Sequence, residues 1–154
     1  MKAYLSLGSN VGDRAAHLAA GVEIVAAGER VRVSRVYETE PVGGVAQDDF
    51  WNLVVELETE ATPRDLLARA RAAEAARGRT REVRWGPRTL DVDVLLVGEL
   101  VSDDPENPVP HPRMFERLFV LAPLAELAPE RVPASALAGA VGRVAPIGTL
   151  ESLR

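Results

Sequence analysis

The stretch that most constrains the fold is residues 89–97, which are apolar on both sides except at Asp91 and Asp93. A half-buried strand alternates apolar and polar residues, whereas this run would bury both of its faces. We therefore expect a β-strand that lies in the centre of its sheet. The two aspartates at its start need a separate explanation, because aspartate is disfavoured in strands.

Hydrophobic periodicity and helix-start signals place the other elements. Thr62 and Pro63 are typical of a helix start, and Gly78 is typical of a helix end. The expected strands are residues 3–7, 31–39, 50–58 and 89–97, and the expected helices are residues 14–27 and 62–77. The order strand–helix–strand–strand–helix–strand is that of the ferredoxin-like βαββαβ fold, an α+β fold with an antiparallel sheet.

The C-terminal third is expected to add helices that form a further layer, giving a three-layer αβα arrangement. We predict short helices over 113–127, interrupted by Pro123, and a last helix over 133–141. In the strand 50–58, the face that carries Trp51 and Leu53 is the expected core face. The opposite face carries Phe50 and Asn52.

The chain of 154 residues suits a single domain, residues 1–154. A net charge of −5 argues against a general nucleic-acid binder. Apolar runs long enough to span a membrane, a signal-peptide pattern and cysteines are all missing from the sequence. These features favour a cytoplasmic protein that acts on small molecules, and we expect it to be a monomer.

Asp91 and Asp93 could carry chemistry, because residues two apart on a strand point to the same face with Cα atoms about 6.6 Å apart. Two carboxylates this close repel each other unless a cation lies between them. Magnesium prefers carboxylate oxygens together with phosphate and water, so a magnesium–nucleotide site is one interpretation. A solvent-facing stretch of an edge strand is the alternative.

A basic segment precedes these aspartates: residues 64–88 hold eight arginines against three acids. Arg84 and Arg88 flank a Gly-Pro turn, and a guanidinium binds phosphate oxygens in a bidentate manner. Arg79 and Arg81 could close over a triphosphate. A solvated basic helix face would explain the same charges, and Trp85 could stack on a base or cover the core.

Two further features suggest ligand contacts. His111 lies between two prolines and could bind phosphate or move a proton, or could have no role. Asn52 offers both a donor and an acceptor, which suits the edge of a heterocycle. Phe50 and Phe119 could enclose a flat ring, although core packing is the simpler explanation for each aromatic residue alone.

Taken together, residues 84–93 closely resemble the signature of the 6-hydroxymethyl-7,8-dihydropterin pyrophosphokinase family. The resemblance extends through Gly8-Ser9-Asn10, residues 37–43, 110–114 and 117–124. It implies a ferredoxin-like α+β fold and transfer of pyrophosphate from ATP to the pterin hydroxymethyl group, with release of AMP, in folate biosynthesis.

The resemblance also implies roles for individual residues. Asp91 and Asp93 would bind two magnesium ions and, with Arg79 and Arg88, would form the catalytic group. The ATP-binding residues would be Glu74, Arg81, Arg84, Trp85, Arg88 and His111. The pterin-binding residues would be Thr39, Pro41, Val42, Phe50, Asn52, Arg117 and Phe119.

The sequence departs from the family pattern at a few positions. Phe50 stands where relatives often carry tyrosine, so stacking is retained without a hydroxyl contact. The segment 79–84 is one residue shorter than in some members, and Glu106 and Pro108 replace residues that contact ATP in some relatives. Two rival functions remain at this point: another magnesium-dependent nucleotide transferase that uses an Asp-x-Asp pair, or a non-catalytic ferredoxin-like binding module.

Overall fold

The structure, a computed structural model, describes residues 1–40, 47–78 and 89–154. The strands are β1 (Lys2–Ser9), β2 (Val31–Val33), β3 (Val36–Thr39), β4 (Phe50–Glu58), β5 (Asp91–Val97) and β6 (Val144–Gly148). The α-helices are α1 (Arg14–Ala26), α2 (Pro63–Ala76), α3 (Leu118–Leu127), α4 (Ala134–Gly139) and α5 (Leu150–Leu153). Two short 3-10 helices, η1 (Met114–Glu116) and η2 (Pro129–Arg131), flank α3.

The strands form one six-stranded sheet in the order β5-β1-β4-β3-β6, with β2 also paired to β4. Every pairing is antiparallel. Without β6, and with β2 and β3 taken as one strand, this is the order of a ferredoxin-like βαββαβ core. The predicted α+β class and the antiparallel sheet are confirmed.

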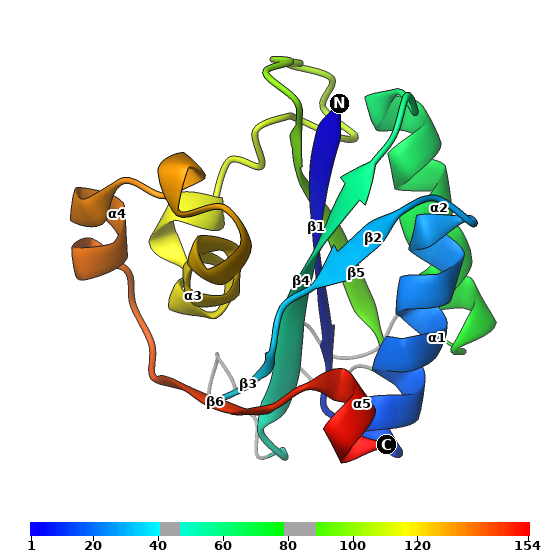
Figure 1. Cartoon of the computed structure of the whole chain (residues 1–154), viewed down its shortest axis with the longest axis vertical. Coiled ribbons are helices and arrows are strands. Elements are labelled where there is room, and N and C mark those ends of the chain that lie inside the picture. Colours follow the sequence, from blue (N-terminus) through cyan, green and yellow to red (C-terminus); the bar gives the residue numbers. More distant parts are fainter. Residues whose placement is uncertain (41–46, 79–88) are drawn as a thin grey trace.

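The sheet lies between two helical layers (Figure 1). Helices α1 and α2 cover one face, where Leu7, Leu18 and Leu66 belong to one buried cluster. Helix α3 covers the other face, where Val54 and Leu124 belong to a second cluster. The three-layer arrangement is therefore confirmed. The predicted core face of β4 is confirmed as well, since Leu53 is fully buried in the first cluster, and burial of Val54 shows that the opposite face of the strand is also covered.

The predicted central position of the 89–97 strand is also wrong. β5 lies at the edge of the sheet and pairs only with β1 among the described strands. Its residues are apolar on both sides because helices cover both faces, not because strands flank it on both edges. Its outer edge is bound at two points: Glu74 accepts the Val92 N–H at 2.9 Å, and the His111 N–H donates to the Leu95 carbonyl at 2.9 Å.

The strand predicted over 31–39 is broken into β2 and β3 at Ser34. The Ser34 N–H donates to the Val54 carbonyl at 3.0 Å, and the Ser34 hydroxyl accepts the Val54 N–H at 3.0 Å. The side chain thus takes the acceptor place that a backbone carbonyl fills in a regular ladder.

Two C-terminal predictions need correction. Pro123 lies inside α3 rather than interrupting it, and burial of Leu121 and Leu124 against the sheet offsets the lost helical hydrogen bond. The helix predicted over 133–141 is observed as the shorter α4, but it is not the last helix, because α5 follows it. Sequence patterns did not reveal β6, which pairs with β3, or α5.

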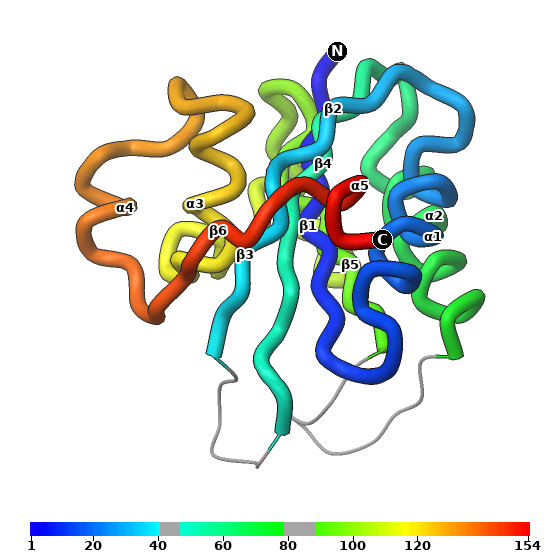
Figure 2. Tube along the Cα trace, turned by 60° about the horizontal axis from the view of Figure 1, so that its bottom comes forward, coloured from blue at the N-terminus to red at the C-terminus, as the bar shows by residue number. Residues whose placement is uncertain are grey.

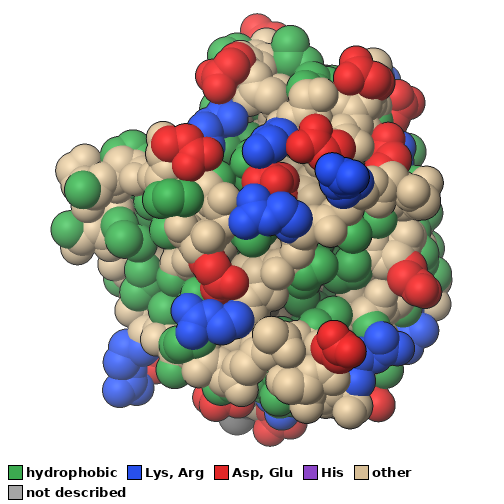
Figure 3. All heavy atoms as spheres, viewed as in Figure 1, with side chains coloured by type: hydrophobic (Ala, Val, Ile, Leu, Met, Phe, Trp, Pro, Cys, Tyr) green, Lys and Arg blue, Asp and Glu red, His purple; other side chains and the backbone are tan. Residues whose placement is uncertain are grey.

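The ends of several elements gather at one end of the molecule, at the bottom of Figure 2. They are the last residues of β1, β3 and α2 and the first residues of β4 and β5. The space-filling view shows acidic and basic side chains interspersed on one face of the molecule (Figure 3). Some of the charged side chains form ion pairs, for example Arg32 with Glu56 at 3.2 Å. Within the described ranges, each helix is too short or too polar to cross a membrane.

Candidate active site

Strand register brings residues from four strands into one row across the sheet. Asp91 of β5 pairs with Gly8 of β1, Gly8 with Asn52 of β4, and Asn52 with Tyr37 of β3. Residues paired in this way point to the same face, and neighbouring strands lie about 4.8 Å apart. A carboxylate and a carboxamide therefore lie two strands apart on the face that α3 covers, with a glycine between them.

The aspartate pair lies at the start of β5. Asp91 and Asp93 are both half-buried, and the Asp93 side chain keeps 47% of its surface exposed. The described residues hold no cluster of three or more acidic, histidine or cysteine side chains of the kind that encloses a metal. The pair offers two half-buried carboxylates on one face, a donor set suited to a hard cation that keeps water or phosphate among its ligands.

Glu74 reaches this strand from the last turns of α2. Its carboxylate accepts the backbone N–H of Val92, the residue between the two aspartates. α2 begins after Thr62, as the sequence predicted, and a capping box between Thr62 and Asp65 fixes this end of the helix. The observed bond makes Glu74 a support of the aspartate strand, while its nucleotide contact stays a prediction.

His111 lies next to Asp93, with 3.9 Å between Nε2 and Oδ1. Its Nδ1 accepts the backbone N–H of Arg113 at 3.2 Å, so the neutral ring carries its proton on Nε2. Burial lowers the pKa of His111, Asp93 opposes that shift, and the Arg117 and Arg113 charges add to it. The lowered pKa favours a neutral His111 ring, whose Nε2–H lies on the side of Asp93.

The carboxamide end of the row is more deeply buried. Asn52 and Thr39 are each 4% exposed, and Asn52 Nδ2 donates to Thr39 Oγ1 at 2.8 Å. This bond fixes the orientation of the amide. A Cβ on Gly8 would collide with Asn52 Oδ1, so only glycine leaves the Asn52 carboxamide in place, while the Phe50 ring would be at an ordinary contact distance of 3.6 Å.

Phe119 comes from the first turn of α3, which packs against β4 and β3. The Arg117 guanidinium lies over the Phe119 ring, 5.7 Å from its centroid. The structure therefore brings Phe119 to the helical layer that covers Phe50 and Asn52. A ring held between Phe50 and Phe119 stays a prediction.

The remaining predicted residues lie outside the described part of the chain. They are Pro41, Val42, Arg79, Arg81, Arg84, Trp85 and Arg88. Of the departures from the family pattern, Glu106 forms an ion pair with Arg71 of α2 at 3.5 Å.

Sequence reasoning missed a support between β3 and α3. Glu126 accepts the Tyr37 hydroxyl at 2.8 Å, the Arg35 Nε–H at 3.1 Å and the Arg35 backbone N–H at 3.0 Å. Residues this far apart in the chain carry no local pattern that would link them. The contact joins the strand that carries Thr39 to the helix that carries Phe119.

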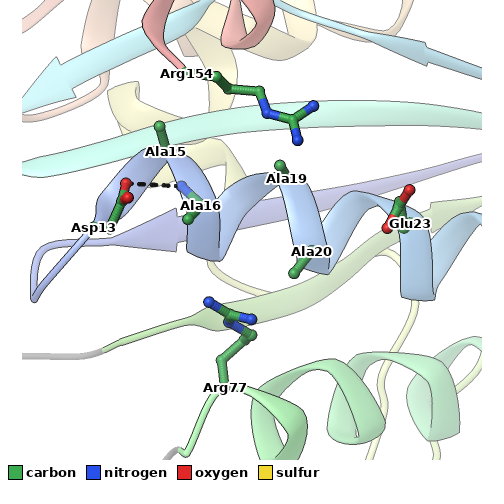
Figure 4. A pocket seen from close by; sticks show the side chains of 8 residues that line it. All are labelled: Asp13, Ala15, Ala16, Ala19, Ala20, Glu23, Arg77 and Arg154. Carbon is green, nitrogen blue, oxygen red and sulfur yellow. Dashed lines mark hydrogen bonds between the residues drawn. The ribbon is translucent and has the colours of Figure 1, made fainter.

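A separate pocket of about 400 Å³ lies over α1, on the other helical layer (Figure 4). Alanine side chains such as Ala16 and Ala19 line it, with Arg77 and Arg154 on opposite sides. None of the residues predicted from the sequence lines this pocket. The predicted residues that the described strands carry, such as Asp91 and Asn52, lie instead on the opposite face of the sheet.

Comparison with known proteins supports the same assignment. Residues 4–129 match the family model of 7,8-dihydro-6-hydroxymethylpterin-pyrophosphokinase. The chain is similar to the 2-amino-4-hydroxy-6-hydroxymethyldihydropteridine pyrophosphokinase of Bacillus subtilis (strain 168), with 50% identity over 128 residues that cover 81% of this chain and 77% of the relative. The enzyme of the same name from Methylorubrum extorquens is 51% identical over 135 residues, which cover 85% of each chain. That from Pseudomonas aeruginosa is 44% identical over 139 residues, or 86% of this chain and 84% of the relative.

Proposed function

This chain belongs to the 7,8-dihydro-6-hydroxymethylpterin pyrophosphokinase family, and on that premise we propose its reaction and the residues that perform it. It is an ATP-dependent pyrophosphokinase of folate biosynthesis, transferring pyrophosphate from ATP to the hydroxymethyl group of 6-hydroxymethyl-7,8-dihydropterin and releasing AMP. The family match does not favour the rival transferase or the non-catalytic binding module.

The observation that carries the residue assignment is the row Asp91–Gly8–Asn52. The Asp91 carboxylate and the Asn52 carboxamide share one face, roughly 10 Å apart at two strand spacings, which supports a cation-binding role for the first and a ring-reading role for the second. That span suits a substrate whose flat ring lies on the amide while its hydroxymethyl group points to the carboxylates.

Asp91 and Asp93 would hold two magnesium ions, and two half-buried carboxylates on one face of β5 fit that role. Bound magnesium would neutralise the phosphate oxygens on which charge develops. Glu74 would keep the two aspartates in register by binding the backbone between them.

On the pterin side, the Asn52 amide would read the ring edge, and Thr39 would hold that amide in orientation. Phe50 and Phe119 would stack on the two faces of the ring, with Arg117 beside Phe119. By the family resemblance, Pro41 and Val42 complete this pocket.

On the ATP side, neutral His111 would donate its Nε2–H to a phosphate oxygen beside Asp93. The family resemblance assigns the other phosphate contacts to the basic segment. These residues are Arg79, Arg81, Arg84 and Arg88, with Trp85 among them and Glu74 near the nucleotide.

The substrate hydroxyl oxygen would attack the β-phosphorus in line with the departing AMP. No covalent bond to the protein forms, so the side chains act by orientation and by charge neutralisation. The described elements share one sheet, which supports a single domain over residues 1–154. We further propose that this domain acts as a monomer in the cytoplasm.

An assay for AMP tests the proposal. The chain is incubated with ATP and magnesium, with and without 6-hydroxymethyl-7,8-dihydropterin. AMP release that requires the pterin supports the proposal, whereas AMP release without it, or none in its presence, contradicts it. Omitting magnesium from the complete mixture should abolish the reaction.

A further inference from the structure

Phe50, the first residue of β4, has a strand partner on one side only. It pairs with Thr39 of β3, whereas the register between β4 and β1 ends at the pair Trp51–Ser9. Beyond Ser9 the chain turns towards α1, at the end of the molecule seen at the bottom of Figure 2. The backbone just before Phe50 therefore has no partner from β1, because the pairing of β1 with β4 ends at Ser9 and Trp51.

Side chains from the turn after β1 and from α1 bind the backbone there instead. Asn10 Nδ2 donates to the Asp48 carbonyl at 2.9 Å and to Gln47 Oε1 at 2.8 Å. Arg14 Nη1 donates to the Asp49 carbonyl at 2.9 Å. Two successive carbonyls before Phe50 are therefore held by side chains.

Arg14 also binds the residue that follows Phe50. Its guanidinium lies over the Trp51 ring, 4.3 Å from the centroid. The Trp51 indole N–H donates to Glu38 Oε2 of β3 at 3.0 Å, which fixes the ring in its plane. One guanidinium thus holds the carbonyl before Phe50 and the ring after it.

We propose that Arg14 is a positioning residue for the pterin site, acting through Phe50. Phe50 points to the opposite face of β4 from Trp51, where its ring lies beside Gly8 and Asn52. Holding both neighbours of Phe50 fixes its backbone and so the direction of its ring. This inference rests on the proposed function, because it assigns Arg14 to pterin binding.

Arginine suits this double contact. Its planar guanidinium can donate in its plane to a carbonyl while its face covers an aromatic ring. Lysine keeps the charge and can reach a carbonyl, but it has no planar group to stack. The two residues should therefore differ in their effect on Phe50.

Steady-state kinetics of Arg14→Ala and Arg14→Lys test the proposal, with Arg64→Ala as the control. Arg64 forms an exposed ion pair with Asp104 at 3.4 Å, away from the site. We expect Arg14→Ala to raise the pterin KM about fivefold, the order of one lost hydrogen bond and one exposed cation–π contact. The ATP KM of Arg14→Ala, and both KM values of Arg64→Ala, should stay at wild-type values. The pterin KM of Arg14→Lys should lie between those of the wild type and Arg14→Ala.

A double-mutant cycle with Phe50→Leu tests whether the effect passes through Phe50. In the Phe50→Leu background, Arg14→Ala should raise the pterin KM little further. Effects that multiply in the double variant, a parallel rise in the ATP KM, or an unchanged pterin KM would overturn the proposal.

A measurement without any substrate separates this inference from the proposed function. Amide hydrogen exchange of residues 48–53 should be faster in Arg14→Ala than in the wild type, and unchanged in Arg64→Ala. If the wild type released no AMP, the proposed function would be contradicted. Faster exchange in Arg14→Ala would still support the part of the inference in which Arg14 fixes the backbone around Phe50. Unchanged exchange in Arg14→Ala would contradict the proposed role of Arg14, whether or not the variant releases AMP.

Discussion

The two ends of the Asp91–Asn52 row are built differently. The amide end lies on inner strands, where Asn52 and Thr39 are almost fully buried and bind each other. The carboxylate end lies on an edge strand, half exposed, and Glu74 supports its backbone from α2. A flat heterocycle is recognised by fixed polar groups, whereas cations and phosphates bring water with them and need open ligands. On the proposed assignment, the Asn52–Thr39 pair would be fixed before the pterin binds, whereas the aspartate pair would depend on the ligands it receives.

The largest expected effect is at the exposed end. Asp93→Asn should reduce AMP release by roughly 10³-fold or more, because it removes a negative charge that the proposed magnesium ions require. Its thermal unfolding should stay close to that of the wild type, since the side chain is half exposed. Asp103→Asn, an exposed aspartate outside the site, is the control. Near-normal turnover in Asp93→Asn would contradict the assignment of the metal site.

At the buried end, Gly8→Ala should be nearly as damaging for a different reason. The new methyl would displace the Asn52 carboxamide, and a misplacement of about 1 Å costs roughly 100-fold in turnover. Calorimetric titration should show weak pterin binding with ATP binding retained. The control is Gly139→Ala, where a Cβ would meet nothing within 4 Å. An equal loss of ATP binding would show that the two halves are not independent.

A smaller effect is expected where side chains support the edge strand. Glu74→Ala should lower kcat/KM about tenfold, the order seen when a group that orients a metal ligand is lost. Glu74→Gln should recover much of this, because its amide oxygen can still accept the Val92 N–H. If Gln were as poor as Ala, the charge of Glu74 and not its bond to β5 would be what matters.

The smallest effect concerns the link between β3 and α3. Burial acts to raise the pKa of Glu126, but hydrogen bonds from Tyr37 and Arg35 outweigh it and leave the pKa lowered. A carboxyl group with a lowered folded-state pKa stabilises the fold above its unfolded pKa of 4.5, and this stability is lost as the pH falls through the folded value. Glu126→Gln should therefore reduce the free energy of unfolding at pH 7 by about 1 kcal/mol. The difference should shrink below about pH 4.5, as urea unfolding at several pH values would show.

The sequence predicted those parts of the molecule that rest on local signals. The Thr62 capping signal and the alternation of β4 are readable in a few residues, and the Asp91–Asp93 spacing was enough to place both carboxylates on one face. The edge position of β5 was not predictable, because an apolar run reports burial of its faces and not the number of its neighbours. The Glu126 and Arg14 contacts depend on long-range packing, which no local pattern encodes.

The two outer edges of the sheet carry a consequence for the behaviour of the protein in a crowded solution. An uncovered edge strand invites the strand of another molecule and so promotes aggregation. On β5, bonds from Glu74 and from the His111 backbone occupy edge positions, and on β6, Pro146 has no N–H to offer. The contacts that steady the aspartate strand thus also discourage recruitment of a foreign strand to the same edge. On the proposed function, one set of bonds would both support the reaction and oppose pairing of β5 with a strand of another molecule.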